Sequence, residues 1–161
     1  MRRLVPASIL LGLAAGFLVF WFTPAQVVKR RTESFLKVIT LDASENPTRR
    51  QLGAYSLNAL LAEQVELEST TIHEANGSFA RSQLESAYAW LCQQARQTRF
   101  HLLKFQSVTV TENRAEVSFT VDALVELPNY RPADGSYQAV FHWHETHDGW
   151  RLAKARWTTQ P

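Results

Sequence analysis

The sequence predicts an α+β protein in which an N-terminal transmembrane helix precedes three helices packed on a four-stranded antiparallel sheet. Three observations lead to this class: a charge-free apolar run near the N-terminus, apolar residues at helical spacing up to residue 95, and apolar residues at a spacing of two after Thr98. Helices followed by a meander of strands are typical of a domain with its helices on one sheet face. The length of 161 residues fits one domain, expected at residues 26–161, and an appendage at residues 1–25.

The apolar run covers residues 4–22 and is close to the ~20 residues that cross a hydrocarbon core. Arg2 and Arg3 precede it, and Trp21 lies at its far end, where aromatic rings prefer the membrane interface. A cleaved signal peptide is the alternative, since residues 23–25 are small, but its apolar region is typically only about 7–15 residues long. We therefore expect an uncleaved signal-anchor and a single membrane span.

The orientation of this span is nearly balanced by charge, because two arginines precede it and Lys29, Arg30 and Arg31 follow it. A very short N-terminal tail usually stays inside, so we expect a single-pass protein of the bacterial inner membrane with its soluble domain in the periplasm. A cytoplasmic domain stays open as the alternative.

The composition of the chain restricts the kinds of binding partner and the disulfides that can be expected. The formal charge is only +2, with 45% hydrophobic and 20% charged residues, which indicates a packed globule and argues against nucleic acid as a partner. Cys92 is the single cysteine of the sequence, so no disulfide can form within the chain.

The helices are expected in the first half of the soluble part. The first is residues 26–41, and the second begins at Thr48, which forms a capping box with Gln51. The apolar stripe of the second helix is expected to consist of Leu57, Leu60, Leu61 and Val65. A turn at residues 73–78 separates it from the third helix, which starts at Ser82. The third helix carries the clearest stripe, formed by Leu84, Ala87, Tyr88, Leu91, Cys92 and Ala95.

The strands follow at residues 101–111, 115–127, 137–146 and 150–158. Residues 112–114 form the first turn, and Asp148-Gly149 is a strong hairpin turn before the last strand. Residues 128–136 form a longer loop in the middle.

Two segments resemble the nuclear-transport-factor-2-like superfamily, whose cone is a curved sheet wrapped around helices. Residues 107–119 are similar to that family's strand, turn and strand, and residues 147–152 look like its final hairpin. The resemblance implies a curved sheet over residues 26–158 and three kinds of function. These are small enzymes of the ketosteroid isomerase-like and dehydratase-like kinds, ligand-binding modules, and membrane-anchored scaffolds such as the periplasmic domains of type IV secretion assembly proteins.

The inward face of the predicted sheet has no readable acid or base for an isomerase-like site. Along residues 115–127 the apolar side chains share one face, whereas Asp122 and Glu126 lie on the other. We therefore expect no enzymatic activity and no cofactor. The side chains expected to line a cavity between helices and sheet are Tyr55, Tyr88, Phe119, Val121, Phe141 and Trp143.

A metal site is a weaker candidate. His142 and His144 are two residues apart on one strand and project from the same face, and His147 lies in the following turn. Because catalytic zinc generally takes three protein ligands, we interpret these histidines as residues of the outer sheet face and expect no bound metal.

These inferences lead to three functional hypotheses. The first is a membrane-anchored, non-catalytic scaffold that binds a protein partner or a second copy of itself through the outer sheet face. The second is a protein that binds an apolar small molecule or lipid inside the cone. The third is an isomerase-like or dehydratase-like enzyme.

Overall fold

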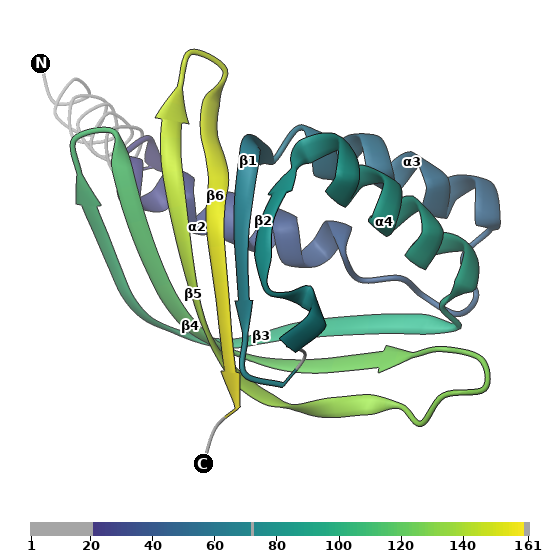
Figure 1. The fold of residues 1–161 in the computed structure, drawn as a ribbon. Helices are drawn as coiled ribbons and strands as arrows, with labels where there is room; N and C mark the ends of the chain where they lie inside the picture. The colour runs from purple at the N-terminus through teal and green to yellow at the C-terminus, as the bar shows by residue number, and fades with distance from the viewer. Residues whose placement is uncertain (1–20, 72, 160–161) are drawn as a thin grey trace, which may run out of the picture.

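The computed structural model describes residues 21–71 and 73–159 and combines a mixed sheet of six strands with three short α-helices in these residues (Figure 1). The elements in chain order are α2 (Pro24–Val38), α3 (Pro47–Asn58), β1 (Leu61–Ser69), the 3-10 helix η1 (His73–Ala75), β2 (Gly77–Ala80), α4 (Arg81–Gln94), β3 (Gln97–Thr111), β4 (Arg114–Glu126), β5 (Ala133–Thr146) and β6 (Gly149–Thr159).

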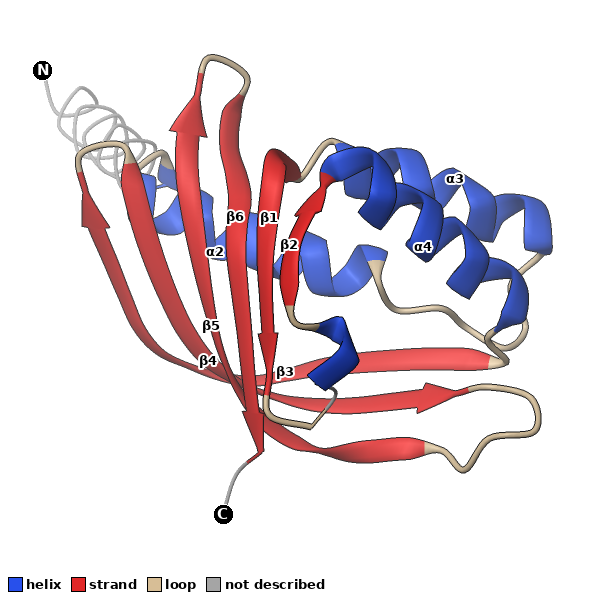
Figure 2. Cartoon of the chain, in the orientation of Figure 1, coloured by secondary structure: helices blue, strands red, loops and turns tan. Residues whose placement is uncertain are grey.

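The strand order across the sheet is β2-β1-β6-β5-β4-β3. Neighbouring strands are antiparallel except β1 and β6, which run parallel. The long strands β3, β4 and β5 bend along their length, so that one end of the sheet curls below the helices (Figure 2). Register shifts between Leu102 and Lys104, and between Phe105 and Ser107, interrupt the β3–β4 ladder near this bend. Such irregularities bend a strand and increase its twist.

Helix α2 lies on the inner face of the sheet and forms the centre of the core. Its Val28 and Leu36 are buried, and the ring of Phe35 meets the ring of Phe141 edge-on, with 5.3 Å between centroids. Phe141 also packs edge-on against Phe119 at 4.9 Å. Edge-to-face contacts of this kind stabilise beyond the area they bury.

Helices α3 and α4 pack beside each other and are joined to the rest of the fold by polar side chains. Asn46 caps α3 by accepting a hydrogen bond from the backbone of Thr48 at 2.9 Å. Arg50 donates to the backbone carbonyls of Ala95, Arg96 and Asp42. These bonds connect α3 to the segment between α4 and β3.

The predicted sheet of four antiparallel strands is wrong in strand number and direction. The apolar stripe that was assigned to the second helix continues into β1, where Leu61 and Val65 are buried as strand residues. Spacings of three and four residues fit a helix, but parallel pairing with β6 and antiparallel pairing with β2 determine the outcome. The residues read as a turn at 73–78 form η1 and the start of β2. The α+β class itself is correct.

The expected membrane span also requires correction. Residues 4–20 lie outside the described part of the chain, and residues 21 and 22 precede α2. Within residues 21–71 and 73–159, no helix is both long and apolar enough to cross a membrane. This finding corrects the single-pass signal-anchor, the membrane as a partner, and the inner-membrane location with a periplasmic domain that followed from it.

Candidate functional site

An apolar cavity of about 430 Å³ lies between the helices and the curled end of the sheet, and we call it the inner cavity. Phe35, Ile39 and Leu91 line it from the helices. The strands and the segment that follows β1 contribute Leu67, Glu68, Ser69, Thr71, Ala75, Phe100, Ala123, Val125, Ala133, Tyr137, Ala155 and Trp157. A concave, mostly apolar hollow of this size is the usual form of a small-molecule site.

The wall of the inner cavity is held by aromatic contacts. The ring of Trp157 lies 6.1 Å from that of Phe100 and 5.4 Å from that of Phe141, measured between centroids. Beside these rings the sheet carries small residues, because Ala123 pairs with Gly135 and Val125 with Ala133 across β4 and β5. These small side chains leave the inner cavity open, whereas large side chains fill the corresponding space elsewhere between the sheet and the helices.

Glu68 is the one carboxylate among the described residues that line the inner cavity, and its negative charge is paired with two basic side chains. Lys154 donates to one carboxylate oxygen at 2.6 Å and Arg156 to the other at 2.5 Å. These two hydrogen bonds lower the pKa of Glu68 to about 2, and the bond from Lys154 has the larger effect. Lys154 and Arg156 flank Ala155, which points inward, so the ion pairs lie on the outer face of the sheet. Glu68 is therefore ionised at neutral pH and not placed as a base for a molecule inside.

A second apolar hollow, the helix pocket, lies between α3, α4 and β1 and has a volume of about 360 Å³. Its own lining residues are Leu57, Leu61, Val65, Leu84, Ala87, Tyr88, Trp90 and Leu152. It shares Phe35, Ile39, Leu67 and Leu91 with the inner cavity. Tyr88 turns its hydroxyl away to donate to the backbone carbonyl of Val38, and burial raises its pKa.

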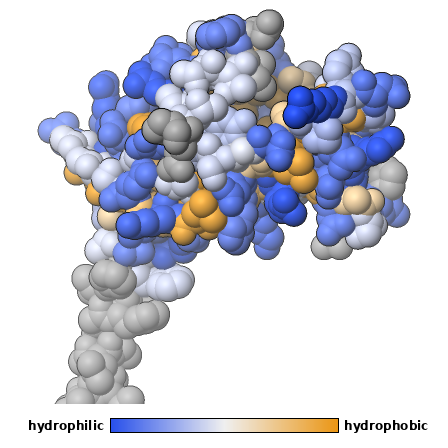
Figure 3. Space-filling view, turned by 90° about the horizontal axis from the view of Figure 1, so that it is seen from below, coloured by the Kyte–Doolittle hydropathy of each residue, from blue (hydrophilic) through white to orange (hydrophobic). Residues whose placement is uncertain are grey.

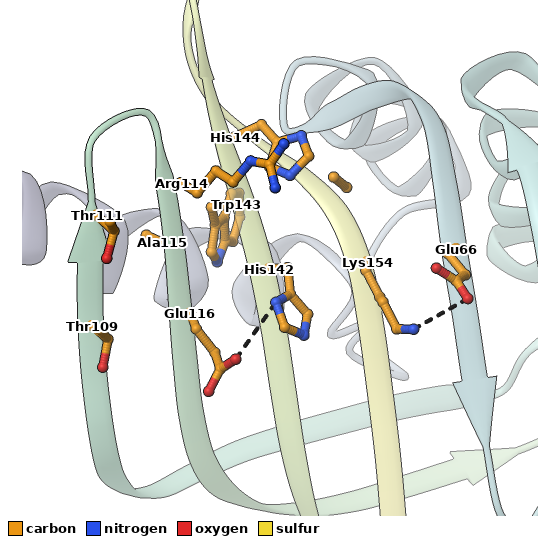
Figure 4. Close-up of a pocket in the computed structure, with 11 residues that line it drawn as sticks. Glu66, Thr109, Thr111, Arg114, Ala115, Glu116, His142, Trp143, His144 and Lys154 are labelled. Carbon is orange, nitrogen blue, oxygen red and sulfur yellow. Dashed lines mark ion pairs between the residues drawn. The ribbon is translucent and has the colours of Figure 1, made fainter.

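The outer face of the sheet carries a polar groove of about 500 Å³, the outer groove, shown in Figure 4. Its two carboxylates have partners in the described lining: Glu66 lies 3.1 Å from the ammonium group of Lys154, and Glu116 lies 3.7 Å from the imidazole of His142. Arg114 and His144 are cross-strand neighbours on β4 and β5. The pKa of His144 is lowered mainly by burial, and to a smaller extent by the charges of Arg114 and His142. The groove thus contains one ion pair, between Glu66 and Lys154, and a contact of Glu116 with an imidazole.

The candidate cavity residues from the sequence are placed in different parts of the fold. Phe119, Val121, Phe141 and Trp143 are fully buried in the packed core, Trp143 is also among the residues that line the outer groove, and Tyr88 lines the helix pocket. Tyr55 is 73% exposed on α3 and lies away from both hollows.

The candidate metal ligands do not converge. His142 and His144 line the outer groove, whereas His147 is 90% exposed in the hairpin turn, 3.2 Å from Asp148. In the described part of the chain, no group of three His, Cys, Asp or Glu residues is arranged to hold a metal ion.

Sequence reasoning missed several lining residues, among them Leu67, Phe100, Ala133 and Trp157. Alternation from Trp150 and Leu152 would have placed Trp157 on the outer face, because a register shift between β5 and β6 at Ala153 reverses the parity of the residues that follow. Leu67 could not be found by alternation either, because its segment was read as part of a helix.

The fold is similar to solved structures of the nuclear-transport-factor-2-like superfamily. A superfamily protein from Salmonella enterica serovar Typhimurium aligns with a TM-score of 0.63 and 12% identity, over 86% of this chain and 92% of its own. A proposed dehydratase of the family from Streptomyces avermitilis aligns with a TM-score of 0.62 and 17% identity, over 85% and 96%. A proposed scytalone dehydratase from Novosphingobium aromaticivorans gives 0.62 and 15%, over 83% and 82%. Identities this low show a shared fold and no shared activity.

The predicted family resemblance is therefore confirmed at the level of the fold. The sequence matches no protein-family model and no curated protein.

Proposed function

We propose that residues 26–161 form a non-catalytic domain that binds an apolar small molecule in the inner cavity. The observation that carries this proposal is a cavity of about 430 Å³ with an apolar wall. Its single carboxylate in the described lining, Glu68, is held by Lys154 and Arg156. Burial of apolar ligand surface against such a wall supplies the binding free energy, at roughly 25 cal/mol per Å².

Dehydratase-like activity is the second candidate, and the fold shared with two proposed dehydratases favours it. Elimination of water requires a group that removes a proton and a group that protonates the leaving oxygen. Tyr137 lines the inner cavity and could act as an acid, but the described lining offers no histidine and no unpaired carboxylate as the base. Binding without chemistry is therefore the better-supported reading.

A scaffold that acts through a broad apolar surface is less well supported. The large exposed apolar side chains are spread over several elements, with Leu52 and Tyr55 on α3, Trp90 on α4, Leu103 on β3 and Tyr130 in the loop after β4. The face seen from below is mainly polar, with small and separated apolar patches (Figure 3). Single exposed apolar residues are normal on a monomer and do not mark an interface.

The test compares two alanine-to-leucine variants in strands of the sheet. Ala123→Leu adds a side chain to the wall of the inner cavity, and Ala153→Leu adds the same side chain in the outer groove. Binding of an apolar fluorescent probe is measured by titration, and thermal unfolding checks that both variants fold. Because overpacking costs about 1–3 kcal/mol, Ala123→Leu should weaken binding about 5- to 150-fold, whereas Ala153→Leu should not change it.

Equal binding by both variants and the unaltered chain would contradict the proposal, and so would the absence of binding by the folded chain. Turnover of a hydroxylated ring compound that is lost in Tyr137→Phe would support the dehydratase candidate instead.

A further inference from the structure

We infer that the ligand is a single straight aliphatic chain with an uncharged hydrogen-bonding head group, which lies with its head in the inner cavity and its tail in the helix pocket. This inference rests on the proposed function and specifies the chemical class of its ligand.

The two hollows adjoin each other inside the fold. Phe35 of α2, Ile39 directly after that helix, Leu67 of β1 and Leu91 of α4 line both. A residue that lines both hollows belongs to the boundary between them, so that boundary is about one side chain thick. Leu67 and Leu91 are only partly buried, and an aliphatic side chain that is not tightly packed changes rotamer on a fast timescale. A methylene chain is narrow enough to pass where these side chains move aside.

The polar groups are distributed unequally between the two ends. Thr71 and Tyr137 line the inner cavity with hydroxyl groups. In the helix pocket, the hydroxyl of Tyr88 is used by the carbonyl of Val38, and the other side chains of the described lining are aliphatic or belong to Trp90 and Phe35. A head group that makes hydrogen bonds therefore meets two hydroxyl groups in the described lining of the inner cavity, against one donor, the indole N–H of Trp90, in the helix pocket.

The charge of the head group is limited by the same residues. Lys154 and Arg156 lie on the outer face and are paired with Glu68, so no cation in the described lining faces the inner cavity. A carboxylate head would lose its hydration without gaining a counter-charge, which is costly in an apolar site. An alcohol or an aldehyde avoids this cost.

A straight chain also fits the shape of the two hollows better than a rigid ring system does. The inner cavity and the helix pocket measure about 430 and 360 Å³ and meet across the shared side chains. A fused ring system that fills one hollow cannot extend through a constriction formed by Leu67 and Leu91, and it leaves the other hollow without contacts. A chain that continues into the helix pocket gains contacts at both ends.

The experiment measures the affinity of the full chain for straight primary alcohols from octanol to octadecanol, by competition with an apolar fluorescent probe. Each additional buried methylene contributes about 0.8 kcal/mol, which is about a fourfold gain in affinity. This gain should continue beyond the chain length at which the inner cavity is filled. Long alcohols should also shift the fluorescence of Trp90, which lines the helix pocket, and this signal is identified by its loss in Trp90→Phe.

Two tryptophan substitutions on α4 provide the matched comparison. Leu84→Trp places a bulky ring in the helix pocket, and Gln93→Trp places the same ring on the exposed side of the helix. Leu84→Trp should reduce the affinity for the longest alcohols to that for the short ones and leave the short ones unchanged. Gln93→Trp should leave the whole series unchanged.

The outcomes separate this inference from the proposed function. If no alcohol binds, the proposed function itself fails. If short alcohols bind but longer ones gain nothing, or if Leu84→Trp does not affect the longest alcohols, the inner cavity ends at Leu91 and the inference is overturned while the proposed function stands. A fatty acid that binds more tightly than the alcohol of equal length would overturn the uncharged head group.

Discussion

Arg50 connects the two helices of the helix pocket to the start of β3, and its replacement tests how much this connection stabilises the fold. The side chain is 9% exposed and donates to the carbonyls of Ala95 at 2.8 Å, of Arg96 at 2.9 Å, and of Asp42. In Arg50→Met the volume is largely kept, while the carbonyls of Ala95 and Arg96 lose this donor and that of Asp42 keeps only the backbone N–H of Glu45 at 3.1 Å.

The expected loss follows from two opposing contributions. A hydrogen bond from a charged donor contributes about 1.5–3 kcal/mol, so three bonds alone would suggest a loss of roughly 4–9 kcal/mol. The folded variant no longer has to bury a guanidinium group, whose Nε has no hydrogen-bond partner among the described residues, and this offsets part of the loss. We expect the free energy of unfolding to fall by about 2–4 kcal/mol, a large fraction of the 5–15 kcal/mol typical of a domain.

Urea unfolding followed by circular dichroism measures this loss, and the neighbouring arginine supplies the control. Arg96 has a 65% exposed side chain, 3.5 Å from Glu126, and an exposed ion pair contributes less than about 1 kcal/mol. With a urea slope of about 1–3 kcal/mol per molar, Arg50→Met should lower the midpoint by about 1–2 M, and Arg96→Met should change it little. Similar midpoints for the two variants would refute the assignment of Arg50 as the link between these elements.

Three further predictions concern single polar side chains. Thr98→Val should reduce the free energy of unfolding by about 1–2 kcal/mol in urea titrations, because the carbonyl of Ile39 loses the hydroxyl that donates to it at 2.6 Å; an unchanged midpoint would contradict this. The depressed pKa of Glu68, about 2, means that its ion pairs stabilise the fold above the unfolded-state pKa, and that this contribution is lost as the pH falls toward 2. Glu68→Gln should therefore lose less stability than the unaltered chain between pH 5 and pH 2 in unfolding measurements, and parallel pH profiles would disprove it. Since the charge of Arg114 helps to lower the pKa of His144, Arg114→Gln should raise that pKa in an NMR titration of the imidazole protons, and an unchanged pKa would show that Arg114 does not contribute.

The second half of the fold was largely readable from the sequence, because its signals are local. Alternation along β4 placed Val117, Phe119 and Val121 on the inner face, and all three are fully buried. The predicted hairpin turn joins β5 and β6, one residue earlier than expected, at His147 and Asp148. Gly149, the first residue of β6, has a φ of 94°, a conformation that favours glycine.

The first half was misread where the structure depends on distant partners. β1 pairs in parallel with β6, and Leu67 of β1 lies opposite Ala155 of β6. No turn marks a parallel neighbour that lies so far along the chain. The stripe that ends at Val65 fits a helix as well as the buried side of a strand, and only the presence of β6 decides between them. The lining of the inner cavity shares this dependence, since Leu67, Ala155 and Trp157 meet only once β1 is placed.

The position of the inner cavity follows from a gradient of side-chain size along the inner face. At the closed end, the large side chains of Phe119, Phe141 and Trp143 are fully buried, and Phe141 contacts Phe35 of α2. Toward the curled end, the facing positions of β4 and β5 become Ala123 and Gly135, which cannot reach the helices. The long strands bend along their length, and this end of the sheet curls below the helices (Figure 2). The change from large to small side chains can be read from the sequence. The cavity also requires the bend of the sheet, because in a flat sheet the helices could pack directly against the small residues. Enlarging Ala123 therefore tests both the proposed binding site and the physical origin of the cavity.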